Sequence, residues 1–246
     1  MTAVQAKGLI KRYKGKTAVD SLDITVEKGE IFALLGVNGA GKTTTIRMLT
    51  CLSRPTGGEA YICGHNVISE SAEVKRIVGV STQDTAVAEN LTVRENLELM
   101  AKIYGISAGK RSERVSEMQR SFRLDEVMDQ RAKTLSGGWK RRLSIAMALI
   151  SEPEVLFLDE PTLGLDVLAR RELWTAIESL RGKITVILTT HYMEEAERLS
   201  DRIAVMVSGK LRALGTLSEL EAMTGESGLE NAFVSIAERS EGGETA

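Results

Sequence analysis

Short runs of apolar and β-branched residues open the chain and predict strands. Two such runs cover residues 4–13 and 18–26, and a turn over residues 27–30 leads to a third run at 31–35. The third run is apolar at every position, which is typical of a strand that is buried on both faces. A glycine-rich loop follows it, and residues 42–52 then have the apolar spacing of an amphipathic helix.

The pattern changes in the middle of the chain. From about residue 90 to residue 150 the β-branched runs disappear, and apolar residues recur at helical spacing instead. Strand patterns stand on either side of this stretch, at residues 59–63, 77–81, 155–158, 184–188 and 203–207, and helical patterns at 168–180 and 193–199. Strands that alternate with helices predict a mostly parallel sheet covered by helices, so the fold class is α/β.

These patterns divide the chain into four parts. Residues 1–85 are expected to form an N-terminal antiparallel β subdomain and the first part of the α/β core, and residues 86–152 an inserted α-helical subdomain. Residues 153–222 return to the core, and residues 223–246 form a short C-terminal tail. Because the sequence beyond Ser235 is rich in Glu, Gly and Ser, we expect that tail to be frayed.

Composition and charge exclude several classes of protein. The 246 residues include 32 Lys and Arg against 34 Asp and Glu, and the resulting net charge of −2 argues against a nucleic acid partner. Two cysteines are too few for the disulfide framework of a secreted domain. The apolar runs are far shorter than the roughly 20 residues that span a bilayer, so we expect any membrane role to come through a partner.

A glycine-rich loop is the first candidate site. The run Gly36-Val37-Asn38-Gly39-Ala40-Gly41-Lys42-Thr43 matches G-x-x-x-x-G-K-[ST] between a predicted strand and a predicted helix. Glycines let backbone N–H groups approach phosphate oxygens, and the positive end of the following helix attracts them. Lys42 would reach the β- and γ-phosphates, the Thr43 hydroxyl would ligate Mg²⁺, and Thr44 would belong to the same phosphate site. The motif predicts a P-loop NTPase core.

A pair of carboxylates supplies the second half of such a site. Asp159 and Glu160 follow the apolar run at residues 155–158, at the carboxyl end of a predicted strand, where ligands bind in open α/β sheets. Asp159 would hold Mg²⁺ through water, and Glu160 would orient the attacking water or take its proton. Taken alone, the pair could equally be a solvated strand end, and the P-loop favours the catalytic interpretation.

The end of the helical stretch indicates the kind of P-loop protein. The run Leu135-Ser136-Gly137-Gly138-Trp139 resembles the signature Leu-Ser-Gly-Gly-Gln of the ATP-binding subunits of ABC transporters, with Trp139 where Gln is usual. We expect a helix to begin just after Ser136, with Ser136 as its N-cap and Trp139 packed along it toward Leu143. A simple loop before a core helix is an alternative reading of the same residues.

The resemblance extends over residues 4–223, and further residues match it in order. The matches are Tyr13, which would stack on adenine; Gln83, the glutamine of the Q-loop and a Mg²⁺ ligand; Leu165 and Asp166 of the D-loop; and His191, the switch histidine. Leu163 departs from the family, where Ser is common. The resemblance implies that ATP and Mg²⁺ are the cofactors.

The resemblance also implies a mechanism. ATP would draw two subunits together head to tail around two ATP molecules, and hydrolysis would separate them. Ser136 and the N–H groups of Gly137 and Gly138 would complete the cage around the γ-phosphate held by the other subunit, because phosphoryl transfer needs a dense positive potential. Within one subunit, the residues implied in hydrolysis are Glu160, His191, Gln83 and Lys42.

Three segments narrow the resemblance further. Residues 90–97, 161–166 and 229–233 look like those of ABC-2-type exporters, which move drugs, antibiotics, lipids or similar cargo. Such a subunit would work in the cytoplasm, on the inner face of the cell membrane, with a separate transmembrane permease and a second ATP-binding subunit (a homodimer or a close paralogue). We expect the permease to dock over residues 86–99, beside Gln83. The alternative is a non-transport ABC-type ATPase that regulates a membrane or ribosomal partner.

Overall fold

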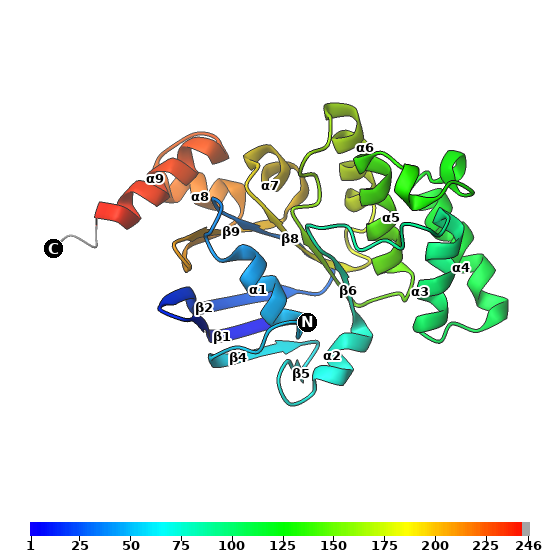
Figure 1. Ribbon diagram of the computed structural model, residues 1–246. Coiled ribbons are helices and arrows are strands. Elements are labelled where there is room, and N and C mark those ends of the chain that lie inside the picture. Colours follow the sequence, from blue (N-terminus) through cyan, green and yellow to red (C-terminus); the bar gives the residue numbers. More distant parts are fainter. Residues whose placement is uncertain (243–246) are drawn as a thin grey trace.

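Two β-sheets form the framework of the protein (Figure 1), whose computed structural model describes residues 1–242. The first is a four-stranded antiparallel sheet in the order β2-β1-β4-β5, and the second is a six-stranded sheet in the order β10-β9-β3-β8-β7-β6. The strands of the first sheet are β1 (Thr2–Tyr13), β2 (Lys16–Glu27), β4 (Gly57–Ile62) and β5 (His65–Asn66). Those of the second are β3 (Ile31–Leu35), β6 (Val78–Ser81), β7 (Val155–Asp159), β8 (Thr185–Thr190), β9 (Arg202–Val207) and β10 (Lys210–Gly215).

The six-stranded sheet is parallel except at one edge, which confirms the predicted α/β fold. Strand β3 pairs in parallel with β8 and β9, and β7 with β6 and β8, whereas β10 runs antiparallel to β9. All five residues of β3 are buried because both faces of the sheet are covered. Its alternate residues enter two cores: Ile31 and Leu35 pack with the helical subdomain, and Phe32 and Leu34 pack with the first sheet and α1.

The helices lie on the faces of the central sheet and at the two ends of the molecule (Figure 1). They are α1 (Lys42–Leu49), α2 (Ser71–Ile77), α3 (Val93–Ile103), α4 (Ala108–Ser121), α5 (Gly137–Leu149), α6 (Val167–Glu178), α7 (Met193–Leu199), α8 (Leu217–Thr224) and α9 (Leu229–Gly242), with 3₁₀ turns at Asp125–Val127 and Ala132–Thr134. Helices α3 and α4 lie at one end, beside α5, and α9 lies at the opposite end. Helices α3, α4 and α5 therefore stand between β6 and β7 in the chain.

The C-terminal segment differs from the expected tail. Helix α9 runs to Gly242, so the fraying expected beyond Ser235 is wrong up to that residue, and residues 243–246 lie outside the described part of the chain. Phe233 and Ile236 are each 6% exposed and join the core cluster that also contains residues of α7 and β9. The polar composition suggested a frayed segment. However, Leu229, Phe233 and Ile236 recur at helical spacing, and one buried apolar stripe is enough to dock a helix on the core.

Smaller differences concern helix ends and short elements. The first helix ends at Leu49 rather than at residue 52, since Cys51 has a left-handed φ of 58° that a helix cannot continue. Helices α2 and α8 and strand β10 were not predicted. Within residues 1–242, no helix combines the length and the apolar character needed to cross a membrane.

Candidate functional site

The loop between β3 and α1 depends on glycine at two positions. Gly39 and Gly41 have φ values of 84° and 102°, a left-handed conformation that residues with a Cβ rarely adopt. A Cβ at Gly41 would also lie 2.5 Å from the carbonyl oxygen of Ala18. Helix α1 then begins with no capping side chain and no acidic residue in its first turn. Its first N–H groups have no intrahelical partner, so this helix start fits a phosphate group.

Lys42 places a positive charge inside this loop. Its Nζ donates to the carbonyl oxygens of Gly36 at 2.6 Å and Val37 at 3.3 Å. The same atom pairs with Glu160 Oε1 at 3.2 Å, and each of the two side chains is only 6% exposed. Backbone oxygens thus hold the Lys42 ammonium inside the loop. At this position it could neutralise the negative charge of a phosphate bound to the loop.

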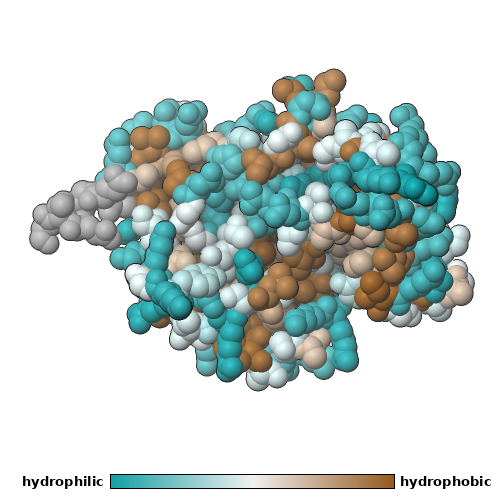
Figure 2. All heavy atoms as spheres, viewed as in Figure 1, coloured by the Kyte–Doolittle hydropathy of each residue, from teal (hydrophilic) through white to brown (hydrophobic). Residues whose placement is uncertain are grey.

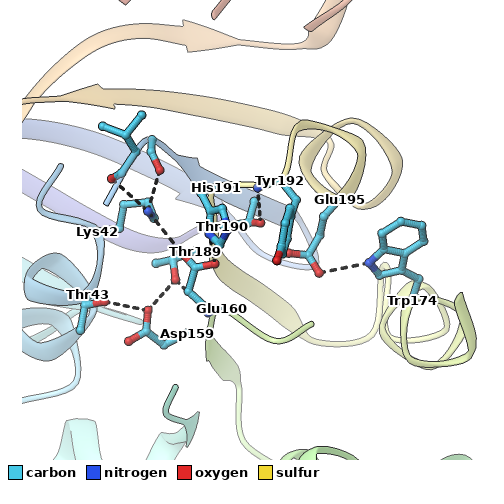
Figure 3. A network of polar contacts seen from close by, with 12 residues as sticks. Lys42, Thr43, Asp159, Glu160, Trp174, Thr189, Thr190, His191, Tyr192 and Glu195 are labelled. Carbon is cyan, nitrogen blue, oxygen red and sulfur yellow. Dashed lines mark hydrogen bonds and ion pairs between the residues drawn. The ribbon is translucent and has the colours of Figure 1, made fainter. Parts of the chain in front are cut away.

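Asp159 ends β7 and lies beside two hydroxyl groups (Figure 3). Thr43 Oγ1 donates to Asp159 Oδ1 at 3.0 Å, and Thr189 Oγ1, from the neighbouring strand β8, donates to the same oxygen at 2.5 Å. The Asp159 residue is buried. A carboxylate and a hydroxyl side by side are oxygen ligands of the kind that Mg²⁺ prefers, so this part of the site fits that ion.

Glu160 follows directly, and its backbone turns sharply. Its φ of 50° lies in the left-handed region, and its N–H donates to both the carbonyl oxygen and the hydroxyl of Thr189, at 3.1 Å and 3.0 Å. A strained residue of this kind costs about 1–3 kcal/mol and is typical of functional sites. One carboxylate oxygen reaches Lys42, and the other lies 2.8 Å from His191 Nδ1. Glu160 is thereby held between a cation and an imidazole (Figure 3).

Lys42, Thr43, Glu160 and His191 open onto one cleft of about 570 Å³, a volume that suits a nucleotide. The buried Asp159 does not line this cleft and is connected to it by the hydrogen bond from Thr43. Two of the predicted ATP residues, Gly36 and Val37, do not line this cleft. Its lining residues are Tyr13, Lys16, Ala18, Asn38, Gly39, Ala40, Gly41, Lys42, Thr43, Thr44, Gln83, Glu160, Leu163 and His191. Tyr13 is 48% exposed, and the Lys11 ammonium lies 5.0 Å from its ring centroid. An aromatic ring at one side and a phosphate-binding loop at the other fit the two ends of ATP.

The signature residues lie outside this cleft. Ser136 is the N-cap of α5, as expected, but its hydroxyl makes no capping hydrogen bond to the helix. Ser136 and Gly137 are both exposed, and none of the signature residues, all of which the structure describes, lines the cleft. The start of α5 therefore presents its N–H groups and a hydroxyl to the outside of the molecule.

Trp139 packs between the apolar core and a charged pair. It contacts the core cluster that contains Leu143, and the Arg142 guanidinium lies 4.8 Å from its ring centroid. Arg142 also forms an ion pair with Glu172 of α6. The indole that replaces the usual Gln thus helps to fix α5 against α6 and leaves the Ser136 hydroxyl uncovered.

The D-loop residues directly precede α6, and Asp166 is its N-cap. Asp166 Oδ1 accepts from the N–H groups of Ala169 and Leu168 at 3.0 Å each, and these hydrogen bonds, chiefly that of Ala169, hold the pKa of Asp166 below its usual value. A Cβ at Gly138 would lie 3.4 Å from the Ala169 Cβ and 4.0 Å from the Leu165 side chain. The D-loop and the signature are therefore neighbours within one chain.

Two residues in or beside the site, Thr189 and Glu195, had no sequence prediction. Thr189 positions both Asp159 and Glu160, and it directly precedes Thr190 and the switch histidine in the sequence. Glu195 is fully buried, its Oε1 accepts from Trp174 Nε1 at 3.1 Å, and burial raises the pKa of its carboxyl. The available signals were weak, because a Thr at a strand end and a Glu on a helix are ordinary residues.

Comparison with known proteins agrees with this geometry. The family described as "ABC transporter" matches residues 19–163. The daunorubicin/doxorubicin resistance ATP-binding protein DrrA of Streptomyces peucetius is 46% identical over 224 residues, which are 91% of this chain and 68% of that protein. The probable multidrug ABC transporter ATP-binding protein YbhF of Escherichia coli is 39% identical over 241 residues, which are 96% of this chain and 42% of that protein.

Solved structures share the fold. An ATP-binding subunit of an ABC transporter, 30% identical, superposes with a TM-score of 0.87 over 96% of this chain and 99% of its own. A dimeric ATP-binding cassette in a post-hydrolysis state, bound to ADP and Pi and 27% identical, superposes with a TM-score of 0.79 over 87% of this chain and 98% of its own. Since the family match spans more than half of the chain, this chain belongs to the ABC transporter family, as one of its ATP-binding ATPase subunits.

Proposed function

We propose that this chain is the motor subunit of a membrane exporter and that Mg-ATP binds in the cleft between the P-loop and β7. The observation that carries the proposal is the meeting of a cation, a carboxylate and an imidazole from separate segments at this cleft, namely Lys42, Glu160 and His191. A second carboxylate, Asp159, accepts a hydrogen bond from Thr43 of the P-loop. The P-loop N–H groups and Lys42 would hold the phosphates, and Tyr13 would stack on the adenine ring.

The same cleft would hold Mg²⁺ through Thr43, Gln83 and Asp159, with Asp159 acting through water. Hydroxyl, amide and carboxylate oxygens suit this ion, which would neutralise charge on the transferred phosphate group. Support comes from the hydrogen bonds that Thr43 and Thr189 donate to Asp159, because they keep its carboxylate directed at the P-loop.

Hydrolysis needs a water molecule that is aligned with the γ-phosphate and loses a proton. Phosphate oxygens would compete with Glu160 for the Lys42 ammonium, which frees Glu160 Oε1 to accept that proton. His191 lies 2.8 Å from the other oxygen and would fix the direction of the carboxylate. Glu160 is thus the proposed catalytic base, and His191 keeps it in place.

One chain offers only part of the required positive environment, because Ser136 and the signature glycines lie outside its cleft. A head-to-tail dimer would bring them to the γ-phosphate of the second copy. Val167 and Leu168 support this arrangement: they are 62% and 74% exposed beside Asp166, at the start of α6, where hydrophobic atoms stand at the top of Figure 2. The dimeric cassette with ADP and Pi is consistent with two chains sharing two nucleotides.

A hydrophobic groove beside Gln83 suits a permease. It has a volume of about 400 Å³ between the end of α1, strand β6 and helix α3, and hydrophobic atoms gather in this region in Figure 2. Its lining residues are Thr50, Leu52, Lys75, Val78, Val80, Thr82, Ala86, Met100, Tyr104, Ser144, Met147 and Ala148. Leu52 is 54% exposed and Tyr104 is 39% exposed, and apolar surface of this kind marks protein interfaces. The groove meets the predicted docking segment 86–99 at Ala86.

Docking there would hold the chain at the inner face of the cell membrane through its partner. The relatives named for daunorubicin, doxorubicin and multidrug resistance favour a drug-like cargo. Selection of that cargo would belong to the permease, because the nucleotide would occupy the cleft of this chain.

Cysteine crosslinking in detergent-solubilised membranes tests the docking site. Cysteines at Leu52 and Leu91 should crosslink to a protein with several apolar spans, identified by mass spectrometry. Val234→Cys is the matched control, because Val234 is 47% exposed on α9, which lies at the opposite end of the molecule from α3 in Figure 1. The two native thiols interfere little, since burial raises the pKa of Cys51 and raises that of Cys63 to about 11. Crosslinks from Val234 alone, or crosslinks to a ribosomal protein, would contradict the proposal.

A further inference from the structure

A buried arginine connects the helix that carries the signature to the loop that carries Gln83. Arg141 lies on α5, in the second turn after Ser136, and is 5% exposed. Its Nη1 donates to the carbonyl oxygen of Thr82 and its Nη2 to that of Gln83, each at 2.7 Å. These two carbonyl groups belong to the peptide units on either side of the Gln83 Cα. One guanidinium therefore holds the backbone directly before and directly after Gln83.

Packing alone does not explain an arginine at this position. Leu143 and Ile145 of the same helix are fully buried, and an apolar residue at position 141 would avoid the cost of burying a charge. Burial lowers the pKa of Arg141, and the nearby carboxylates of Asp159 and Glu195 oppose that shift. The two backbone hydrogen bonds are what the guanidinium gains in return.

We propose that Arg141 is a positioning residue that ties the Gln83 loop to the signature helix, so that Gln83 and Ser136 move as one body. The inference rests on the proposed roles of Gln83 toward Mg²⁺ and of Ser136 toward the nucleotide of a second copy. Gln83 lines the cleft of its own chain, whereas Ser136 lies outside it. A rigid connection between the two therefore links the two nucleotide sites of a dimer physically.

The same connection reaches the groove that suits the permease. Thr82, which accepts a hydrogen bond from Arg141, lines the groove together with Ser144 and Met147 of α5. Ser144 Oγ also lies 2.9 Å from Ser81 Oγ, so a second polar contact ties α5 to the end of β6. A partner bound in the groove would contact both the Thr82 backbone and α5. If that contact displaced either of them, Arg141 would transmit the displacement to Gln83.

The geometry requires an arginine rather than any cation. A guanidinium is a planar fork that donates to two acceptors in fixed directions, whereas an ammonium is a compact point charge on a flexible stem. The chain offers a matched control in Arg114 of α4. Its Nη2 donates to the carbonyl oxygen of Leu149 at 3.0 Å and its Nε to that of Ile150 at 3.3 Å, at the opposite end of α5 from the signature.

A double-mutant cycle on the ATPase activity of the full chain tests the inference. At saturating ATP, Arg141→Lys should lower kcat about tenfold, as misplacement of an aligned group does, and should raise the Mg²⁺ concentration for half-maximal rate. The KM for ATP should change by less than about twofold, because the P-loop is untouched. Gln83→Ala should lower kcat similarly, and the double variant should be no slower than Gln83→Ala alone. Arg114→Lys should keep wild-type turnover.

Two outcomes overturn the inference: losses that multiply in the double variant, or wild-type kcat and Mg²⁺ dependence in Arg141→Lys. Wild-type turnover of Gln83→Ala alone would refute the proposed role of Gln83 itself, and that single variant distinguishes the two failures. Thermal unfolding checks that each variant is folded. If Arg141→Lys does not fold, Arg141→Gln, which keeps an amide donor without the charge, enters the same cycle with the same expected result.

Discussion

Replacing Glu160 by glutamine tests the hydrolysis site most sharply. The amide keeps the shape of the side chain, so its oxygen can still accept from Lys42 Nζ, which lies 3.2 Å from Glu160 Oε1. Its nitrogen can donate to His191 Nδ1, which lies 2.8 Å from Oε2, when the imidazole carries its proton on Nε2. The substitution removes the negative charge, and with it the capacity to accept a proton from water.

The structure sets the size of two effects. General-base catalysis contributes about 10²–10⁴-fold, so turnover by Glu160→Gln should fall by at least about 100-fold. The Lys42–Glu160 pair joins side chains that are each 6% exposed, so water screens it little. Replacing its charged acceptor by a neutral one should lower the free energy of unfolding by about 1–2 kcal/mol, or the Tm by about 2–8 °C. Mg-ATP at about 100 times its Kd should restore about 2.7 kcal/mol.

Three measurements on the same protein check these values: phosphate release, thermal unfolding with and without Mg-ATP, and size-exclusion chromatography with Mg-ATP. Glu160→Gln should bind ATP, hydrolyse it slowly and accumulate as dimers. Glu152→Gln is the matched control, because Glu152 also has a left-handed φ, 55°, but its side chain is 73% exposed and outside the cleft. The control should hydrolyse ATP at the wild-type rate. Wild-type turnover by Glu160→Gln would show that another group activates the water.

Further substitutions test the nucleotide site and the signature. Lys42→Ala should abolish ATP binding and hydrolysis, because it removes the buried cation of the P-loop, and wild-type affinity in an ATP titration would refute the site. Tyr13→Ala should weaken ATP affinity roughly fivefold or more through loss of stacking, and unchanged affinity of a folded variant would show that Tyr13 only covers the sheet. Trp139→Gln should keep at least about a third of wild-type turnover, because the ring stacks on Arg142, whereas Ser136→Arg should lose nearly all of it by placing a bulky cation at the dimer contact. Equal losses in these two variants, assayed at saturating Mg-ATP, would make the indole part of the catalytic machinery.

The P-loop, its strand and the start of its helix could be predicted from the sequence because their causes are local. The apolar run at Ile31–Leu35 forms a strand buried on both faces, and Gly39 and Gly41 take backbone conformations that other residues avoid. Helix α7 begins and ends where its apolar spacing predicts, at Met193–Leu199. Each of these features depends on residues only a few positions apart.

The start of the signature helix could also be predicted from neighbouring residues, since Ser136 is its N-cap. The position of this helix relative to the P-loop could not be predicted in that way. Sequence order alone could not show that the signature lies outside the cleft of its own chain while Gln83 lines it. That separation comes from the packing of α3, α4 and α5 into one core beside the sheet.

Only the tertiary structure decided which distant residues meet. Thr189 holds Asp159 because β7 and β8 are neighbours in the sheet, and Arg141 reaches the carbonyl of Gln83 across 58 positions of sequence because α5 packs beside β6. Helix α9 docks on the core although its composition predicts a frayed tail. The physical reason is the same in each case: strand order and helix docking are set by burial between segments far apart in the chain, which no local pattern of residues records.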